Sequence, residues 1–535
     1  MSKPLKADVI LSKVKKASRE RDWVNACALL QQILHQYPNN NRAKKARQEL
    51  RSSALPELRS QAQKFLSSNA LAEAERHLMA AFYLSPGDLT LGQQLAQCQL
   101  EMGQAPAASD TASKLLETHP NDIKVLNIKA RALRELGQPE KSRTHLLAAL
   151  KLSPEDPATL NNLGILERSI GNRTQAAEYY QRALNFEPDN VSLHQNMSQV
   201  IDYSSADSHL EEMLGLLNSV DRKDPKNAPL FFALFKALDE KDRCVEAFEF
   251  LEQGNRLAAS QANFDFQKHM VPFALTKAIF STESRFESPT ESDFRPIFVT
   301  GLPRSGTTLV EGILSRAQGV QACGELSVVP RAVSQLLRRI MNRPVKSLHA
   351  EDIAQLRDEL LHGFGRYAVQ GTRLVDKMPL NFRWIGYICA ALPEARVIHI
   401  SREPVPVAWS LYKHFFQGAG NDFVHRNEDI SRFMLLHSNY LSFWKSFSFD
   451  QMIDVNYEDL VARPAPTTKQ IALATELKWT EDWLAPERAA NQVLTASADQ
   501  VRKPIYTNGN EGWKRYEPQL ASLQQSLKSV GLLKT

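Results

Sequence analysis

The residues most suited to chemistry lie in GLPRSGTT, residues 301–308, directly after the apolar run PIFVT. Gly301 and Gly306 let the backbone curl so that successive N–H groups face inward, and the helix expected next adds unpaired amides that attract an anion. The glycine spacing matches a phosphate loop that binds ATP, but Thr307 stands where such loops carry a lysine. An anion with less charge than a magnesium triphosphate needs only Arg304, hydroxyls and amides. We therefore expect this turn to bind a phosphate-like group without a metal ion.

Charged and hydroxyl side chains recur in four more motifs of the second half. They are CGE followed by VVPR, DKMP, SREP with Ser410 eight residues after Arg402, and SADQVRKPIY at 497–506. Glu325, in the first of them, is a carboxylate that can take a proton from an acceptor hydroxyl. Arg402 offers a planar fork that suits a phosphate monoester.

Each motif also has a purely structural interpretation. The spacing G-x-x-x-x-G alone is equally typical of an ordinary turn between a strand and a helix. Glu325 can cap a helix that begins at Leu326, and Lys377 can pair with Asp376 on the surface. His399 lies inside an apolar run, so we expect it in the core rather than as a base.

Alternating strands and helices must position these motifs. RPIFVTG, ARVIHIS and QMIDVNYEDL have the apolar character of buried strands, and the segments TLVEGILSRA, DIAQLRDELLHGFGRYAV and NFRWIGYICAAL are typical of helices. This alternation predicts a three-layer α/β domain with a parallel sheet. Ligands of such sheets bind at the carboxyl ends of the strands, which is where the turn at 301–308 falls.

The first half repeats itself every 34 residues. Prolines recur at this interval, and so do turn glycines, with Asn69 in the same phase one period earlier; they are Pro86, Pro120, Pro154, Pro188, Gly103, Gly137 and Gly171. This is the period of the tetratricopeptide repeat, in which Gly or Asn takes the positive-φ position between two helices. Pro38 precedes Pro86 by 48 residues, so the phase is broken near the N-terminus.

The repeat continues in degraded form at 228–257, where two amphipathic segments flank EKDR. We therefore expect an all-α tetratricopeptide-repeat solenoid over 1–275. The concave face of such a solenoid commonly binds a peptide or protein. A spacer or a dimerisation platform is an equally open interpretation, because repeats of this kind do not by themselves identify a function.

Composition narrows the class of protein. The chain has 535 residues, enough for two or three domains, and its net charge of +5 is too small to indicate a nucleic-acid-binding protein. Five scattered cysteines suit a reducing compartment. The N-terminus lacks the apolar core of a signal peptide, and no apolar run approaches the roughly 20 residues that span a bilayer. We expect a cytoplasmic protein with neither nucleic acid nor a membrane as partner.

The five motifs, in this order, resemble those of sulfotransferases that use 3′-phosphoadenosine 5′-phosphosulfate (PAPS). Residues 296–535 are most similar to the tyrosylprotein sulfotransferase group, and the whole chain resembles bacterial-type proteins that join tetratricopeptide repeats to such a domain. The resemblance implies a P-loop-like α/β sulfotransferase domain over 290–535.

The resemblance also implies a role for each motif. The resemblance implies that the 5′-phosphosulfate is bound by Arg304, Ser305, Gly306, Thr307 and Thr308. Glu325 is the expected general base, and Lys377 with Ser497 is expected to stabilise charge on the leaving group. The resemblance further implies that Arg402 and Ser410 bind the 3′-phosphate of PAPS and that Tyr457 contacts its adenine. The segment that closes over the nucleotide would contribute Ser497, Gln500, Val501 and Lys503. Two positions depart from the family pattern: His414 stands at a further basic contact, and a lysine expected before a tryptophan is replaced by Lys514 or Arg515 after Trp513.

The predicted reaction is transfer of a sulfuryl group from PAPS to an acceptor hydroxyl, with no metal required. The resemblance indicates a tyrosine of a protein or peptide that the repeats capture, and a sugar or small phenol remains an alternative acceptor. A P-loop kinase-like phosphotransferase is a second hypothesis, which the missing lysine disfavours. A non-catalytic repeat scaffold is a third.

Overall fold

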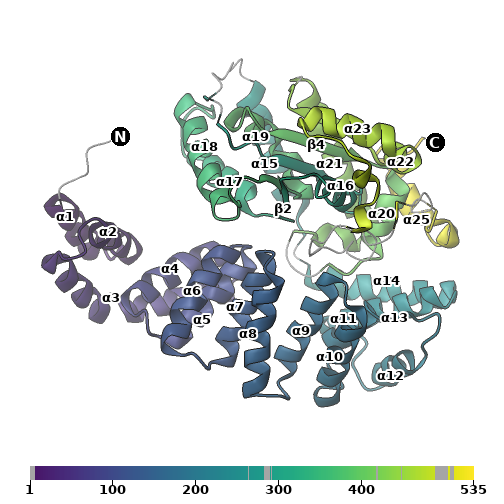
Figure 1. The fold of residues 1–535 in the computed structure, drawn as a ribbon, viewed down its shortest axis with the longest axis horizontal. Coiled ribbons are helices and arrows are strands. Elements are labelled where there is room, and N and C mark those ends of the chain that lie inside the picture. The colour runs from purple at the N-terminus through teal and green to yellow at the C-terminus, as the bar shows by residue number, and fades with distance from the viewer. Residues whose placement is uncertain are drawn as a thin grey trace. The chain divides into compact units, whose positions relative to one another are not determined.

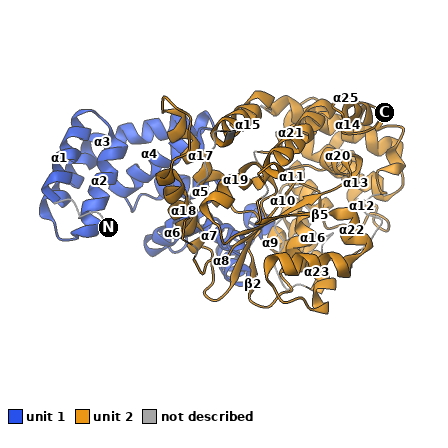
Figure 2. Ribbon diagram, turned by 90° about the horizontal axis from the view of Figure 1, so that it is seen from above, with its two compact units in different colours: residues 1–162 blue, residues 163–535 orange. Residues whose placement is uncertain are grey.

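The computed structural model of the chain describes residues 7–262, 264–281, 289–290, 292–416, 420–447, 449–488, 504–505 and 511–534. The chain divides into two compact units, Met1–Asn162 and Leu163–Thr535 (Figure 2). The first unit is helical, and the second joins further helices to a parallel sheet. The predicted order, an all-α repeat region followed by an α/β domain, is confirmed.

The first unit consists of antiparallel helices that stand side by side, as α5 to α8 do in Figure 1. Gly103 (φ 66°), Gly137 (φ 69°) and Asn69 (φ 55°) take the left-handed conformation at the predicted turns. The helices are α1 (Ala7–Arg19), α2 (Trp23–Gln36), α3 (Asn41–Ser67), α4 (Leu71–Leu84), α5 (Leu89–Glu101), α6 (Ala105–Thr118), α7 (Ile123–Glu135) and α8 (Pro139–Leu152), and α9 (Pro157–Ile170) contains the division between the units.

The length of α3 explains the break in the repeat phase. This helix has 27 residues, whereas α5, the corresponding helix of the next repeat, has 13. The difference is the 14 residues by which the distance from Pro38 to Pro86 exceeds the 34-residue period. The N-terminal repeat therefore keeps the helix–turn–helix arrangement but lengthens one helix.

The second unit begins with the remaining helices of the repeat region. The degraded copy at 228–257 forms α13 and α14 as predicted, and Asp242 (φ 59°) takes the left-handed position between them. The helices are α10 (Arg173–Phe186), α11 (Val191–Ser198), α12 (Ser208–Leu217), η1 (Pro225–Asn227), α13 (Ala228–Glu240), α14 (Cys244–Gln261) and α15 (Phe266–Ser281).

Five parallel strands form the sheet, in the order β2-β3-β1-β4-β5. The strands are β1 (Ile297–Gly301), β2 (Val320–Ala322), β3 (Arg373–Asp376), β4 (Arg396–Ser401) and β5 (Met452–Asn456). Strand β1 is central, with Phe298 opposite Asp376 of β3 and Gly301 opposite Ile400 of β4. The sequence analysis predicted β1, β4 and β5 and did not identify β2 and β3.

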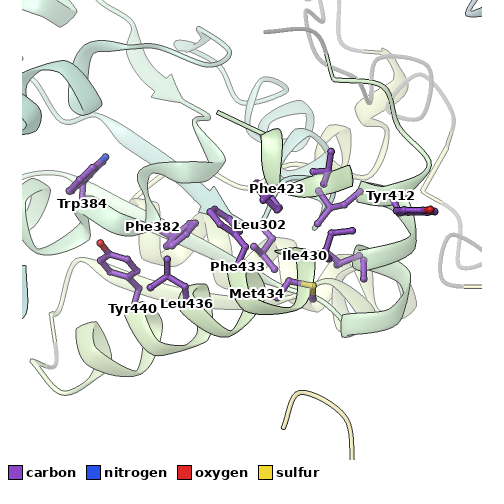
Figure 3. Packing of buried hydrophobic residues seen from close by; sticks show 14 of the residues in the cluster. Leu302, Phe382, Trp384, Tyr412, Phe423, Ile430, Phe433, Met434, Leu436 and Tyr440 are labelled. Atoms are coloured by element: carbon purple, nitrogen blue, oxygen red, sulfur yellow. The ribbon is translucent and has the colours of Figure 1, made fainter. Parts of the chain in front are cut away.

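Side chains of β1 alternate between two buried layers, which makes the domain three-layered. Ile297 and Val299 pack with residues of α16, α22 and α23, whereas Phe298 packs with α17 to α21 on the opposite face. Figure 3 shows part of this second layer, in which Leu302 lies among Phe382, Phe433 and other aromatic residues. The helices concerned are α16 (Thr307–Leu314), α17 (Val328–Met341), α18 (Ala350–Gly365), α19 (Ile385–Ala391), α20 (Pro404–Tyr412), α21 (Asn427–Lys445), α22 (Tyr457–Ala462) and α23 (Pro464–Thr475).

The last pair of repeat-like helices packs directly on the α/β core. Phe235 of α13 meets the Trp409 ring of α20 edge-on, with ring centroids 6.0 Å apart. Asn255 of α14 is buried and donates to the Tyr412 carbonyl at 3.0 Å. These contacts join residues on either side of the boundary predicted between 275 and 290, and the boundary itself stays a prediction.

No helix among the described residues has the length and apolar character needed to cross a bilayer.

Candidate functional site

The turn after β1 has a backbone that requires glycine. Gly306 has φ 109°, and a Cβ at this position would lie 2.5 Å from the Tyr457 ring. Arg304 also takes a positive φ, 71°, which non-glycine residues adopt only rarely. The turn therefore has a tight, left-handed shape immediately before the N-terminus of α16, where unpaired amides favour an anion.

The side chains of the turn fit an anion as well as its backbone does. The Ser305 hydroxyl is buried and has no hydrogen-bond partner among the described residues. Buried hydroxyls normally have a partner, so this one fits a ligand oxygen bound in the turn. Thr307 and Thr308 are also buried, at the first two positions of α16.

Two arginines and a serine, from two motifs, meet beside the turn. Arg304 donates from Nε to Ser410 Oγ at 2.9 Å, and Arg402 donates from Nη1 to the Arg304 carbonyl at 3.0 Å. The Arg402 guanidinium lies over the Tyr457 ring, 4.1 Å from its centroid. Four predicted donor-binding residues, from two motifs and from the position just after β5, therefore form one contact group.

Glu325 and Lys377 form an ion pair, with Lys377 Nζ 2.7 Å from Glu325 Oε1. The lysine side chain is fully buried, whereas the glutamate side chain is 44% exposed. The two structural alternatives are not observed: Lys377 is not on the surface, and α17 begins at Val328 with Ser327, not Glu325, as the preceding residue. A half-exposed carboxylate beside a buried ammonium can both accept a proton and meet an incoming substrate.

Every strand of the sheet contributes one predicted site residue at or just after its carboxyl end. Lys377, Arg402 and Tyr457 directly follow β3, β4 and β5, while Arg304 and Glu325 lie three residues beyond β1 and β2. Because the strands are parallel, these ends share one edge of the sheet. Their order along that edge is Glu325, Lys377, Arg304, Arg402, Tyr457, as the sheet order requires.

Two buried carboxyl groups adjoin the ion pair. Burial raises the pKa of Asp376 to about 8, and it also raises the pKa of Glu311, with the positive charge of Lys377 opposing it in both cases. Asp376 was visible in the DKMP motif, but Glu311 was missed. The signal that would have found it is a lone glutamate inside the apolar helix TTLVEGIL.

The two histidines considered in the sequence analysis are both uncharged at neutral pH. His399 is buried in β4, where its Nδ1 lies 3.2 Å from Thr300 Oγ1, and burial lowers its pKa to about 3. Its expected place in the core is confirmed. Burial, together with the nearby Arg304 charge, lowers the pKa of His414 to about 3. His414 therefore offers a neutral N–H rather than the cation of the family pattern.

The C-terminal part of the predicted site is only partly described. Ser497, Gln500, Val501 and Lys503 lie outside the described residues. Lys514 is exposed and pairs with Glu511 at 2.9 Å. Arg515 donates to Asp242 at 2.8 Å and to the Asp239 carbonyl at 3.0 Å, so its guanidinium binds the turn after α13.

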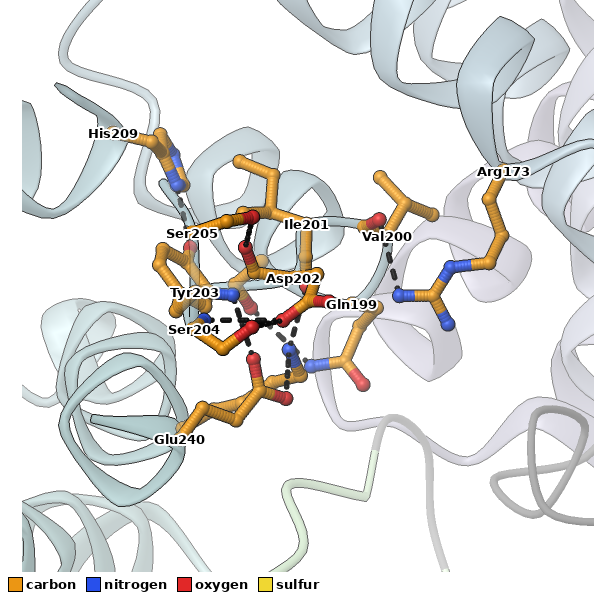
Figure 4. A network of polar contacts seen from close by, with 12 residues as sticks. Arg173, Gln199, Val200, Ile201, Asp202, Tyr203, Ser204, Ser205, His209 and Glu240 are labelled. Carbon is orange, nitrogen blue, oxygen red and sulfur yellow. Dashed lines mark hydrogen bonds and ion pairs between the residues drawn. The ribbon is translucent and has the colours of Figure 1, made fainter. Parts of the chain in front are cut away.

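A second polar cluster lies in the repeat region and needs no metal ion. His194, His209 and Glu212 have possible ligand atoms within 4.8 Å of one another, which is close enough to bind a cation. However, His209 bonds to His194 Nδ1 at 3.0 Å through Nε2 and to the Tyr203 hydroxyl at 2.6 Å through Nδ1, and His194 Nε2 bonds to the Pro188 carbonyl at 2.8 Å. Hydrogen bonds thus account for all four ring nitrogens. Figure 4 shows Tyr203 and His209 in this network, with Glu240 accepting from the Tyr203 amide at 3.0 Å.

Comparison with known proteins identifies the two regions. Residues 296–481 match the model of the sulfotransferase family, and tetratricopeptide-repeat models match residues 16–40, 65–132 and 121–186. The chain is 30% identical over 348 residues to an uncharacterized protein of Aquifex aeolicus, and 22% identical over 236 residues to a protein-tyrosine sulfotransferase of Drosophila melanogaster.

These matches cover 62% and 41% of this chain, and 46% of each relative, so the chain spans about half the length of these two relatives. Among solved structures, a sulfotransferase domain of the Synechococcus PCC 7002 olefin synthase is similar to 46% of this chain. It is 20% identical, with a TM-score of 0.32 over 97% of that domain.

Proposed function

This chain carries tetratricopeptide repeats followed by a sulfotransferase-family domain, and we propose that the domain transfers a sulfuryl group from PAPS to an acceptor hydroxyl without a metal ion. The observation that carries the proposal is the edge of the sheet, where one chemically apt residue follows each of the five strands. The turn after β1 lies at the centre of that edge, and its buried Ser305 hydroxyl has no hydrogen-bond partner among the described residues. The Glu325–Lys377 ion pair lies to one side of the turn.

PAPS supplies the activated sulfuryl group when it is bound. Amides of the turn and the Ser305 hydroxyl would hold the 5′ end, while Arg402 and Ser410 would hold the 3′-phosphate. Placing both ends fixes the donor in line with the acceptor, which is a large part of rate acceleration in transfer reactions. No lysine is needed in the turn, because two arginines already meet beside it.

Glu325 would take the proton of the acceptor hydroxyl, since its half-exposed carboxylate can reach a substrate. The buried Lys377 ammonium would stabilise the charge that develops on the leaving oxygen. In the free protein these two groups neutralise each other. The pair must therefore open for turnover, so that the carboxylate can meet the acceptor hydroxyl and the ammonium can meet the leaving oxygen.

The acceptor we propose is a tyrosine in a protein or peptide, with the repeat region positioning it. The proposal is supported by the similarity of the domain to protein-tyrosine sulfotransferases and by the presence of repeats of a type that commonly binds peptides. A sugar or a small phenol is the competing acceptor.

Transfer of ³⁵S from labelled PAPS tests the reaction. The full chain is incubated with EDTA and a panel of tyrosine peptides, matched phenylalanine peptides, simple phenols and sugars. Label on the tyrosine peptides is the expected result. Label on sugars or phenols alone would overturn the proposed acceptor. Phosphate transfer from ATP in a parallel incubation with Mg²⁺ and without EDTA, together with no transfer of label from PAPS, would indicate a phosphotransferase. No transfer from either donor would leave the scaffold hypothesis.

A further inference from the structure

Two backbone hydrogen bonds join the residues just before Glu325 to β3 and to the residue that follows it. The Cys323 amide donates to the Val375 carbonyl at 3.0 Å, and the Lys377 amide donates to the Gly324 carbonyl at 2.9 Å. These bonds continue the parallel pairing of β2 and β3 past the end of β2. They leave the amides of Gly324 and Leu326, on either side of Glu325, to find other partners.

Each of those two amides donates to a buried carboxyl group, and the two carboxyl groups come from different elements. Gly324 donates to Glu311 Oε1 at 2.8 Å, and Leu326 donates to Asp376 Oδ1 at 3.2 Å. Glu311 belongs to the helix that follows the phosphate-binding turn, and Asp376 immediately precedes Lys377. The backbone around Glu325 is therefore held on one side by α16, the helix after the turn at 301–308, and on the other side by β3, the strand that precedes Lys377.

Both carboxyl groups are themselves fixed. Asp376 is fully buried, and its second oxygen accepts from Asn381 Nδ2 at 3.1 Å. Glu311 is 8% exposed, on a short helix whose apolar side chains pack in the cluster on one face of the sheet. Burying two acids beside one lysine is costly unless they make specific hydrogen bonds, and the bonds they make are to the segment of the base.

We propose that Glu311 and Asp376 are positioning residues that clamp the segment 323–326 and thereby hold Glu325 at the reacting hydroxyl, a role that rests on the proposed function because it takes Glu325 as the proton acceptor. Neither residue touches the substrate in this account. Glu311 also links the base to the donor turn, since it lies four residues after Thr307 on α16.

Paired substitutions separate this role from a general effect on folding. Glu311→Gln keeps an oxygen that accepts from the Gly324 amide, whereas Glu311→Leu removes the acceptor at similar size. Asp376→Asn keeps an oxygen for the Leu326 amide, and Asn381 can turn its carbonyl oxygen, which has no partner among the described residues, toward the new side-chain NH2. Glu394→Gln is the matched control, because Glu394 is another buried carboxylate, bound by Arg357 and Ser292 on a different segment.

Three quantities are measured on the full chain: hydrogen–deuterium exchange of the peptide spanning 322–328 without nucleotide, the Kd for adenosine 3′,5′-bisphosphate, and kcat for transfer from PAPS. For Glu311→Leu we expect exchange at Gly324 to rise at least about tenfold, because its amide loses a buried partner. We expect kcat to fall roughly 10²-fold, as misplacement by about 1 Å can cause, while Kd changes less than about threefold. Glu311→Gln and Asp376→Asn should stay close to the unsubstituted chain, and Glu394→Gln should leave exchange of this peptide unchanged.

Unchanged exchange in Glu311→Leu, or equal damage from Glu311→Gln and Glu311→Leu, would overturn the clamp. Absence of transfer by the unsubstituted chain would refute the proposed function instead, and the exchange data would still decide whether the clamp exists. If Glu311→Leu does not fold, Glu311→Met replaces it, with the same expected results.

Discussion

Replacing Glu325 by glutamine separates the two roles of the Glu325–Lys377 pair. The amide cannot take a proton from the acceptor hydroxyl, so the chemical step loses its base. Lys377 is released from its ion pair at the same time, because glutamine carries no charge. We therefore expect catalysis to fall while nucleotide binding becomes tighter, a combination that a simple loss of folding cannot produce.

The sizes of both effects follow from the site. A positioned general base contributes about 10²- to 10⁴-fold, so kcat should fall by that factor. The ion pair joins a buried lysine to a carboxylate that is 44% exposed at 2.7 Å, and solvent screening limits such a pair to about 1 kcal/mol. Releasing the lysine to bind a phosphate should then tighten the Kd for adenosine 3′,5′-bisphosphate by roughly fivefold.

Isothermal titration with adenosine 3′,5′-bisphosphate and ³⁵S transfer from PAPS measure the two effects. Glu359→Gln is the matched control, since it removes a carboxylate from a partly buried ion pair with Arg339 on α17 and α18, and it should change neither quantity. A Glu325→Gln chain that keeps its kcat is not consistent with Glu325 as the base. Weaker nucleotide binding would contradict the competition between Glu325 and the donor for Lys377.

Three further predictions concern the turn, pH and the limits of the domain. Gly306→Ala should abolish binding of adenosine 3′,5′-bisphosphate in titrations, because its Cβ would lie 2.5 Å from the Tyr457 ring at a φ of 109°; binding within a factor of two of the unsubstituted chain would refute the turn geometry. The contribution of three buried histidines to stability should be complete above about pH 6.5, the ordinary histidine pKa, and be lost as the pH drops below it, because burial lowers their pKa and the unfolded chain protonates them; they are His209, His399 and His437. The raised pKa of Asp376 acts in the opposite direction, because protonation of this carboxyl group favours the folded state. Each histidine should lower the free energy of unfolding by on the order of 1 kcal/mol by pH 5.5. Urea midpoints that do not change between pH 7 and 5.5 in an Asp376→Asn chain, which lacks this opposing titration, would contradict this. A fragment of residues 163–535 should unfold cooperatively, whereas residues 290–535 alone should not, because Phe235 and Asn255 pack against α20; a cooperative transition in the shorter fragment would show that the repeat-like helices are dispensable.

The parts of the fold that repeat or alternate could be predicted from the sequence. The 34-residue period locates the turns because only glycine and asparagine readily take their positive φ, as Gly103 and Asn69 do. Strands β1, β4 and β5 have five or six residues and three large apolar side chains each, whereas β2 and β3 have only three and four residues. A strand that short has no periodicity of its own, so its pairing with a neighbour defines it.

The site was predictable as a set of residues and not as a set of contacts. The motifs indicate Glu325 and Lys377 as site residues. Their ion pair could not be predicted, because it depends on β2 and β3 being neighbours and the sequence analysis identified neither strand. Glu311 was missed because a single glutamate in an apolar helix gives no signal until the helix is placed beside Gly324. The aromatic contacts between α13 and α20 likewise depend on tertiary packing alone.

A crystal structure of the chain with adenosine 3′,5′-bisphosphate tests the central claim most directly. We expect the 5′-phosphate to lie in the turn at 302–308, against the amides at the start of α16 and the Ser305 hydroxyl, with the 3′-phosphate at Arg402 and Ser410. A nucleotide bound at another place, with the turn lacking a ligand, would contradict the account.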